Sequence, residues 1–220
     1  MSAKPLQPLL APADIPGHIP LFPLSGALML PRAELPLNIF EPRYLAMVRD
    51  CLAGPRLIGM VQPRDLSEKP ALYTVGGLGK ITRFAETGDG RFQIILTGIC
   101  RFDIVQELDV LTPYRQAEIS ATAYAADFTD SPALSATARA GLEMALKSYL
   151  EAQAMTADWQ AIANADDESL IHALASVCPF DVAEKQALLE APDLAQRTEI
   201  LTTLMSFVQE QEDDHGPTLH

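Results

Sequence analysis

The chain has 220 residues, of which 48% are hydrophobic and 20% charged, a balance typical of a folded globular protein rather than a disordered one. Lys and Arg total 16 and Asp and Glu total 29, for a net charge of −13, which argues against general nucleic-acid binding because it repels phosphate backbones. The sequence predicts no membrane span, since every stretch of 18 residues contains a charge, a proline or other polar groups.

The composition changes near residue 120. Residues 1–120 carry 12 basic and 12 acidic side chains and 13 of the 17 prolines. Residues 121–220 carry 4 basic and 17 acidic side chains and 21 alanines. Residues that favour turns dominate the first part, and residues that favour helices dominate the second. This distribution predicts a β-rich unit followed by a helical unit, and therefore an α+β chain.

The first 18 residues contain five prolines and glycines and lack the unbroken apolar run of a signal peptide. We therefore expect residues 1–18 to be a disordered leader in a cytoplasmic protein. Four prolines between residues 20 and 36 forbid a helix and allow only short strands. Strands are expected at residues 19–21 and 27–30, with an extended segment at 34–39.

A helix is predicted over residues 42–53. Pro42 suits a first helical turn, and apolar residues from Tyr44 onward recur at spacings of three and four. Gly54 and Pro55 then end the helix.

The stretch from residue 57 to residue 121 predicts further strands. Asp89 and Gly90 form a strong hairpin-turn pair, and Gly98 indicates a bulge or bend. One strand is expected at each of residues 57–61, 76–86, 91–97, 101–107 and 114–121. About seven short strands and one inserted helix indicate a small, closed or nearly closed β structure over residues 19–125.

From residue 131 the apolar period becomes helical. Acidic residues at helix starts and two capping-box spacings set the expected boundaries. Helices joined by short loops should pack as a bundle over residues 131–210, followed by a disordered acidic tail at 211–220. The four helices are expected at residues 132–153, 167–177, 181–189 and 194–210.

The sequence lacks the common catalytic and metal-binding motifs, including a P-loop, a nucleophile elbow and zinc-ligand spacings. His172 stands alone on a predicted helix and is expected at the helix surface or at the edge of the bundle. Cys51, Cys100 and Cys178 are expected to be reduced, buried thiols. These residues predict no enzyme, no metal and no cofactor, although a Ser–Lys or carboxylate pair assembled from distant positions stays open.

Five residues are candidates for binding or for anchoring the fold. Glu41 and Arg43 would tie the helix start to the neighbouring sheet with Tyr44 packed beneath them, or else they would border a binding groove. Arg101 is interpreted as an internal hydrogen-bond anchor rather than a ligand contact, and Phe40 completes the set.

At these residues the sequence resembles a known family. The run at residues 19–52 contains PLFPL at 20–24, LP at 30–31 and LPLNIFEPRY at 35–44, and it is similar to the start of the Lon protease N-terminal (substrate-binding) domain family. GDGRFQIILTGICRF at 88–102 and EKQALLEAPDLAQRTEILTTLM at 184–205 resemble later parts of that family. The likeness extends over residues 19–207.

The resemblance implies a PUA-like β-barrel lobe followed by a helical lobe. It also implies a role in engaging unfolded or damaged polypeptides. The chain lacks the ATPase and peptidase modules of full-length Lon, so it resembles free-standing members and neither activity is carried over. The expected function is a non-catalytic module for exposed polypeptide segments or an adaptor in quality control. A full-length Lon-type protease is a candidate partner, and the groove between the lobes is the expected binding surface.

Two alternatives stay open. One is small-molecule binding or enzymatic chemistry in the cleft between the lobes, which needs convergent polar groups. The other is RNA binding through the PUA-like barrel, which needs Arg83, Arg91 and Arg101 on one exposed face. The net charge argues against RNA, and neither nucleic acid nor membrane is an expected partner.

Overall fold

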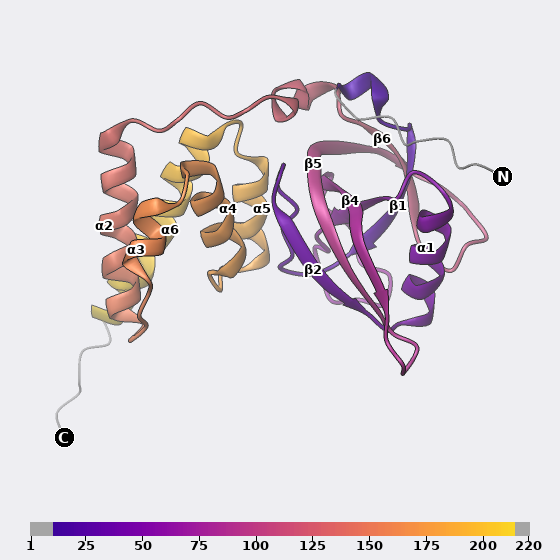
Figure 1. Ribbon diagram of the computed structural model, residues 1–220, viewed down its shortest axis with the longest axis horizontal. Helices are drawn as coiled ribbons and strands as arrows, with labels where there is room; N and C mark the ends of the chain where they lie inside the picture. Colours follow the sequence, from indigo (N-terminus) through magenta and orange to yellow (C-terminus); the bar gives the residue numbers. More distant parts are fainter. Residues whose placement is uncertain (1–10, 214–220) are drawn as a thin grey trace. The chain divides into compact units, whose positions relative to one another are not determined.

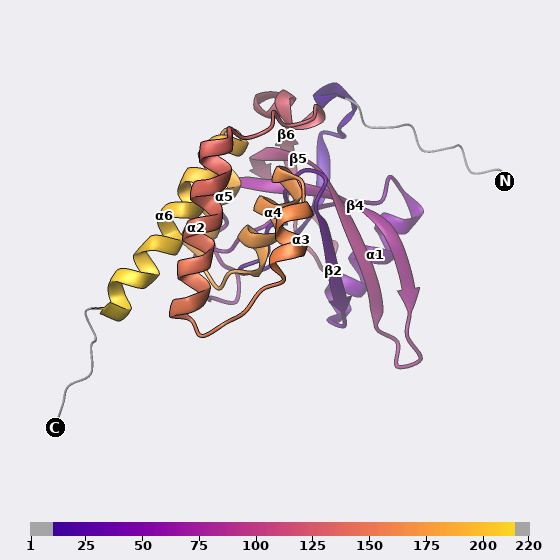
Figure 2. The same cartoon turned by 60° about the vertical axis from the view of Figure 1, so that its left-hand side comes forward.

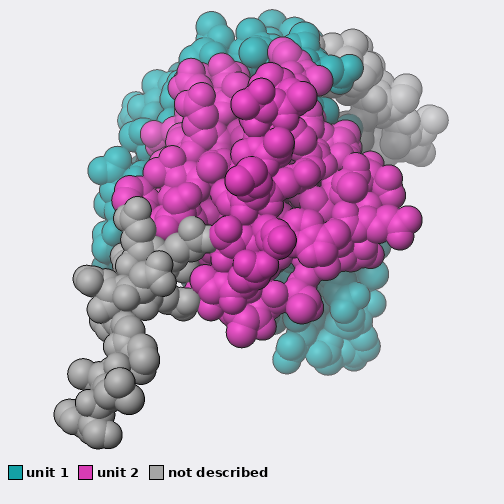
Figure 3. All heavy atoms as spheres, turned by 90° about the vertical axis from the view of Figure 1, so that its left-hand side faces the viewer, with its two compact units in different colours: residues 1–130 teal, residues 131–220 magenta. Residues whose placement is uncertain are grey.

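The computed structural model describes residues 11–213, and the chain divides into two compact units, residues 1–130 and 131–220 (Figure 3). Unit 1 contains a six-stranded mixed sheet and unit 2 contains helices, which confirms the predicted α+β class. The division lies about ten residues beyond the change in composition.

From residue 11 onward, unit 1 contains one long helix, six strands and two short 3-10 helices (Figure 1). The helix begins and ends where the sequence predicts, and so does the third strand. In chain order the elements are a 3-10 helix at Pro12–Asp14, β1 (His18–Pro23), β2 (Glu34–Ile39), α1 (Pro42–Ala53), β3 (Leu57–Val61), β4 (Val75–Glu86), β5 (Phe92–Glu107), β6 (Gln116–Ser120) and a 3-10 helix at Thr122–Phe128.

The strands pair in the order β2-β5-β4-β3-β1-β6, and β6 also pairs with β5. The pairings β5–β4, β4–β3, β3–β1, β1–β6 and β6–β5 therefore follow one another in a closed circuit. β5 makes this possible through its length of 16 residues. Its first part pairs with β2, and its last part pairs with β6.

β5 runs through the point where the sequence predicts a break between two strands. Leu78 pairs with Cys100 while Gly79 pairs with Gly98, so Ile99 is the extra residue of a β-bulge. The predicted irregularity at Gly98 is confirmed, but it bends one strand rather than separating two.

The predicted strand at residues 27–30 is wrong. Met29 and Leu30 are almost fully buried, and their carbonyl groups lie against the backbone of β4 and β5. This approach requires glycine on the sheet, because a Cβ at Gly77 would overlap the Met29 carbonyl oxygen and a Cβ at Gly98 would overlap that of Leu30. The segment is irregular because it crosses the strands instead of pairing along them.

Part of the segment predicted to be a disordered leader is ordered. Pro12–Asp14 forms a turn of 3-10 helix, and β1 begins at His18. Residues 1–10 of the predicted leader lie outside the described residues, as do residues 214–220 of the predicted tail.

Unit 2 contains five helices in the described part of the chain, and α2 and α6 lie side by side in both views (Figures 1 and 2). The four predicted helices are present, with α2 starting four residues later than expected, because Ser135 accepts a hydrogen bond from Ala138 N and caps it there. The sequence analysis missed α3, which is only six residues long. The helices are α2 (Ala136–Ala152), α3 (Trp159–Asn164), α4 (Asp167–Val177), α5 (Val182–Glu190) and α6 (Leu194–Asp213).

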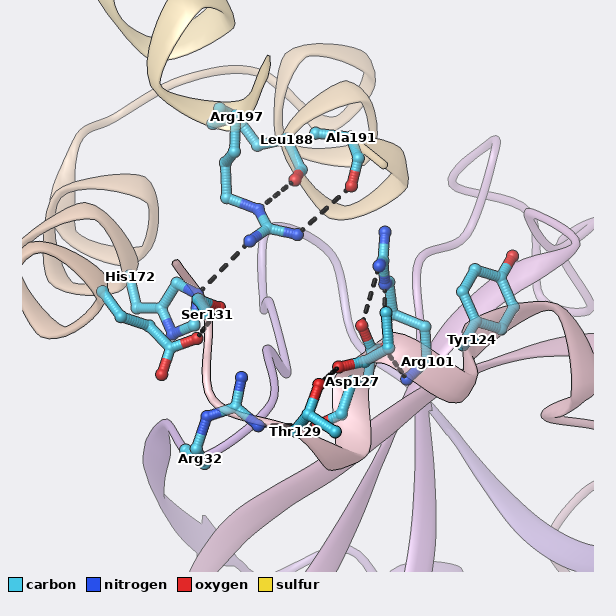
Figure 4. A network of polar contacts seen from close by, with 12 residues as sticks. Arg32, Arg101, Tyr124, Asp127, Thr129, Ser131, His172, Leu188, Ala191 and Arg197 are labelled. Atoms are coloured by element: carbon cyan, nitrogen blue, oxygen red, sulfur yellow. Dashed lines mark hydrogen bonds and ion pairs between the residues drawn. The ribbon is translucent and has the colours of Figure 1, made fainter. Parts of the chain in front are cut away.

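Two buried cations stabilise helix ends inside unit 2. Lys185 Nζ donates to the Ser176 carbonyl at the end of α4, at 2.9 Å. Arg197 Nε donates to the Leu188 carbonyl near the end of α5, at 2.8 Å (Figure 4). Positive charge at a helix C-terminus is favourable because the last carbonyls lack partners within the helix.

His172 is buried, with 5% of its surface exposed, so the prediction of a helix-surface position is wrong. Its Nε2 lies 3.4 Å from Nη1 of Arg197 (Figure 4). Because a guanidinium only donates hydrogen bonds, this nitrogen of His172 acts as the acceptor.

Gly141→Ala is expected to stabilise unit 2 by about 1 kcal/mol, because alanine has a much higher helix propensity than glycine. Gly141 lies inside α2, and a Cβ at this position meets no atom within 4 Å. Urea unfolding followed by the fluorescence of Trp159, the single tryptophan, measures the change. An unchanged or lower midpoint would show that the position is not an open helical site.

Candidate functional site

Unit 1 contains a pocket of about 540 Å³ that is built from four separate parts of the chain. The start of α1 forms one wall, the loop between β3 and β4 forms another, and the residues just before β6 form the third. Pro23 at the end of β1 completes the lining. Four prolines and two tyrosines give the pocket rigid apolar surfaces. The lining residues are Pro23, Arg43, Tyr44, Pro63, Asp65, Leu66, Ser67, Glu68, Lys69, Pro70, Pro113, Tyr114 and Arg115.

Tyr44 is the most buried of the predicted site residues that line this pocket, with 6% of its surface exposed. Its ring packs on Phe22 with centroids 4.2 Å apart. Its hydroxyl has no hydrogen-bond partner among the described residues, and no buried polar side-chain atom among them lacks one, so the hydroxyl opens to the pocket. Burial raises the pKa of Tyr44, which keeps the hydroxyl protonated and available as a donor.

Glu41 and Arg43 pair with each other rather than with the sheet. Nε and Nη2 of Arg43 lie 2.9 and 2.8 Å from the same oxygen, Oε2 of Glu41. The guanidinium carbon lies 4.6 Å from the centre of the Tyr44 ring, a distance at which cation–π attraction operates. The predicted link to the neighbouring sheet is therefore replaced by a local pair at the start of α1, and Arg43 lines the pocket.

The loop wall is held by Asp65. Its carboxylate accepts the backbone N–H of Ser67 at 2.9 Å and that of Ala71 at 3.2 Å, and the hydrogen bonds from Ser67 lower the pKa of Asp65. Arg64 N also donates to the Ala71 carbonyl. This loop is therefore an ordered surface, and it carries the exposed side chain of Lys69 into the pocket.

The third wall is fixed by polar contacts of Tyr114 and Arg115. The Tyr114 hydroxyl donates to Asp50 at 2.7 Å, and burial raises the pKa of Tyr114. Arg115 makes two hydrogen bonds to Glu107 and a third to the Pro70 carbonyl at 2.8 Å. The sequence analysis missed this wall because no motif connects these residues to Arg43 and Tyr44.

Phe40 and Arg101 lie outside the lining of the pocket. Phe40 is 59% exposed, with the Arg91 guanidinium 5.8 Å from its ring. Arg101 is buried, with its side chain 4% exposed, and forms an ion pair with Asp127 at 2.7 Å (Figure 4). This placement is the internal anchor that the sequence indicates for Arg101. It also means that Arg83, Arg91 and Arg101 do not form one exposed face.

The thiols offer little chemistry at neutral pH. Cys51, Cys100 and Cys178 are buried and reduced, as predicted. Burial raises the pKa of Cys51 and of Cys100 to about 12, so both stay protonated. Among residues 11–213, no three His, Cys, Asp or Glu side chains are grouped to hold a metal ion. No described helix is both long and apolar enough to cross a membrane.

The chain matches known proteins over most of its length. The model of the ATP-dependent protease La (LON) substrate-binding domain matches residues 18–206. The chain is 27% identical over 208 residues to Lon protease 2 of Myxococcus xanthus and 29% identical over 198 residues to Lon protease of Cytophaga hutchinsonii. These matches cover 90% and 87% of this chain but 24% of each relative. The chain therefore spans about a quarter of the curated relatives it matches.

Solved structures share the fold at low sequence identity. The Lon N-terminal domain protein from Xanthomonas campestris aligns with a TM-score of 0.60 and 23% identity, over 84% of this chain and 97% of that one. The N-terminal domain of Mycobacterium avium complex Lon protease aligns with a TM-score of 0.59 and 16% identity, over 86% and 98% of the two chains.

Proposed function

Because the chain belongs to the family of Lon substrate-binding domains, we propose that it is a non-catalytic module that binds exposed segments of unfolded polypeptides. The observation that carries this proposal is the pocket of unit 1, where Arg43 and Tyr44 of the family-like motif meet two distant segments. The groove predicted between the two lobes stays a prediction, and the pocket lies within unit 1 alone.

The lining of the pocket suits an extended chain. Proline and tyrosine surfaces offer apolar contact at a low cost in side-chain entropy, because they are rigid. The Tyr44 hydroxyl supplies a hydrogen-bond donor for the backbone carbonyls that an unfolded segment leaves unpaired. Such a site recognises general properties of a chain rather than one sequence, and affinities in the micromolar range are natural since ordering the peptide opposes binding.

The free edge of β2 is poorly suited to the alternative mode, strand addition. In the described part of the chain β2 pairs with β5 alone, and Pro36 lies opposite Ile95. The Ile95 carbonyl faces β4, where it accepts a hydrogen bond from Thr82 Oγ1 at 3.2 Å. When the backbone groups of one residue of an antiparallel pair point away from the partner strand, those of the opposite residue do so as well. The backbone of Pro36 therefore points to the free edge, and because proline has no N–H the middle of that edge lacks a donor.

Four finer features belong to this proposal. The closed circuit of strands corresponds to a PUA-like barrel. The protein acts in the cytoplasm as an adaptor in quality control. A full-length Lon-type protease receives what it binds. The proposed role includes no catalytic step, and the tyrosine and arginine side chains of the pocket serve to position a chain.

The test is fluorescence anisotropy with a labelled, permanently unfolded polypeptide. We expect saturable binding to the unfolded chain and none to its folded form or to an RNA oligonucleotide. Leu66→Asp should weaken binding about tenfold, because Leu66 lines the pocket and loses apolar contact. Leu111→Asp is the matched control, since both leucines are almost fully exposed and Leu111 lies outside the pocket lining. Equal binding to folded and unfolded chains would refute the proposal.

A further inference from the structure

We propose that the pocket of unit 1 recognises the C-terminal carboxylate of a bound polypeptide, held by the Tyr44 hydroxyl, Arg43 and Lys69. This inference rests on the proposed polypeptide-binding function and names the chemical group that the pocket selects.

Tyr44 offers an unused donor. Its ring is buried, and its hydroxyl opens to the pocket. This hydroxyl has no acceptor among the described residues, whereas the Tyr114 hydroxyl in the same pocket donates to Asp50 at 2.7 Å. A donor that is open to the pocket is available to an acceptor of a ligand that displaces water. The difference between the two tyrosines marks Tyr44 as the contact for a ligand acceptor.

Two cations of the pocket lining, Arg43 and Lys69, also keep unused donors. Arg43 directs Nε and Nη2 to a single oxygen of Glu41, which leaves its Nη1 without an acceptor in the described part of the chain. Lys69 is exposed and has no ion-pair or hydrogen-bond partner among those residues. Both cations therefore keep donors for an incoming anion.

The acidic side chains of the pocket do not take these donors. Asp65 is occupied by the backbone N–H groups of Ser67 and Ala71. Glu107 lies outside the lining and is engaged by Arg115 through two hydrogen bonds. Glu41 beside Tyr44 accepts from Arg43 through Oε2, and Glu68 lies exposed on the loop. The donors of Tyr44, Arg43 and Lys69 thus remain for a carboxylate, a group with acceptors only.

The walls of the pocket restrict which carboxylate fits. A group that reaches the Tyr44 hydroxyl must enter a space of about 540 Å³ between the start of α1, the loop between β3 and β4, and the residues just before β6. The end of a chain brings one continuing backbone strand with it, whereas an internal acidic residue brings two. The steric demand therefore favours the chain end over an internal Asp or Glu.

The experiment compares three labelled peptides with one apolar, proline-containing sequence. The first has a free C-terminal carboxylate, the second a C-terminal amide, and the third an amide with an internal Glu. Anisotropy titrations use the full chain, Tyr44→Phe, Lys69→Gln and the control Tyr73→Phe, since Tyr73 lies outside the lining of the pocket. Tyr44→Phe retains the ring that packs on Phe22, and circular dichroism verifies that each variant is folded.

We expect the free acid to bind about tenfold more tightly than the amide, as charge-assisted hydrogen bonds predict. Tyr44→Phe and Lys69→Gln should reduce that preference, and Tyr73→Phe should retain it. The preference should also weaken with added salt. If Tyr44→Phe does not fold, Lys69→Gln decides the test, because Lys69 is exposed.

Three results would overturn the inference in distinguishable ways. Equal affinity for the acid and the amide would show that the pocket does not recognise a carboxylate, while leaving polypeptide binding intact. Binding of the internal-Glu peptide as tight as that of the free acid would show that the pocket does not select the chain end. Failure to bind these peptides and the unfolded polypeptide alike would remove the proposed function itself.

Discussion

Asp127→Ala is expected to destabilise unit 1 by about 3–5 kcal/mol, the usual cost of leaving one partner of a buried ion pair uncompensated. Oδ2 of Asp127 accepts hydrogen bonds from the backbone N and Nε of Arg101, at 2.8 and 3.0 Å, and Oδ1 accepts one from Nη2 at 2.7 Å. The two side chains are 4% and 7% exposed. Truncation removes all three bonds and takes the opposite charge away from a buried guanidinium.

Urea unfolding followed by circular dichroism measures this loss. The matched control is Glu34→Gln, which breaks the pair of Arg83 and Glu34, because those side chains are 70% and 53% exposed and such a pair contributes about 0–1 kcal/mol. The double variant Arg101→Met with Asp127→Leu should recover much of the stability, since it removes both buried charges. A loss in Asp127→Ala no larger than in Glu34→Gln would contradict the assignment of this pair as an anchor.

Gly77→Ala is expected to destabilise unit 1 by about 3 kcal/mol, at the upper end of the cost of overpacking a core. The added Cβ would overlap the carbonyl oxygen of Met29 and approach its carbonyl carbon and Cβ at 2.8 Å. Backbone atoms cannot rotate away as a flexible side chain does, so the crossing segment at residues 28–30 must move. Its three side chains are buried, and moving them opens the core.

Gly88→Ala provides the control for this substitution. Gly88 lies in the turn before β5, and a Cβ there meets nothing within 4 Å. Its urea midpoint should match that of the unchanged chain, whereas Gly77→Ala should unfold at a lower urea concentration. Equal midpoints for the two variants would show that the crossing segment moves without a loss of stability.

The sequence was sufficient to predict the helices whose start, end and apolar spacing are encoded in their own residues. α1 has its proline, apolar spacing and terminal glycine within 13 consecutive positions, and the predicted bounds match the helix at Pro42–Ala53. α4 follows from a run of acids and an apolar period, and it also matches, at Asp167–Val177. Both helices carry their start and stop signals in their own residues.

The pocket could not be predicted in this way. Arg43 and Tyr44 meet Lys69, Tyr114 and Arg115 only because the strands bring three segments together. The crossing of residues 28–30 likewise depends on Gly77 and Gly98, which lie 47 or more positions later in the chain. The ion-pair partner of Arg101 is 26 residues away, in a short 3-10 helix that no local pattern indicates.

The proline in the free edge of β2 has a consequence for solubility. A protein that gathers unfolded chains brings many unpaired backbones to its own surface, where an open strand would act as a template for fibril growth. Pro36 removes the central donor of that template, and Glu34 places a negative charge two residues before it. The edge therefore resists stacking with other strands, which would allow the proposed binding module to hold aggregation-prone chains without joining their aggregates.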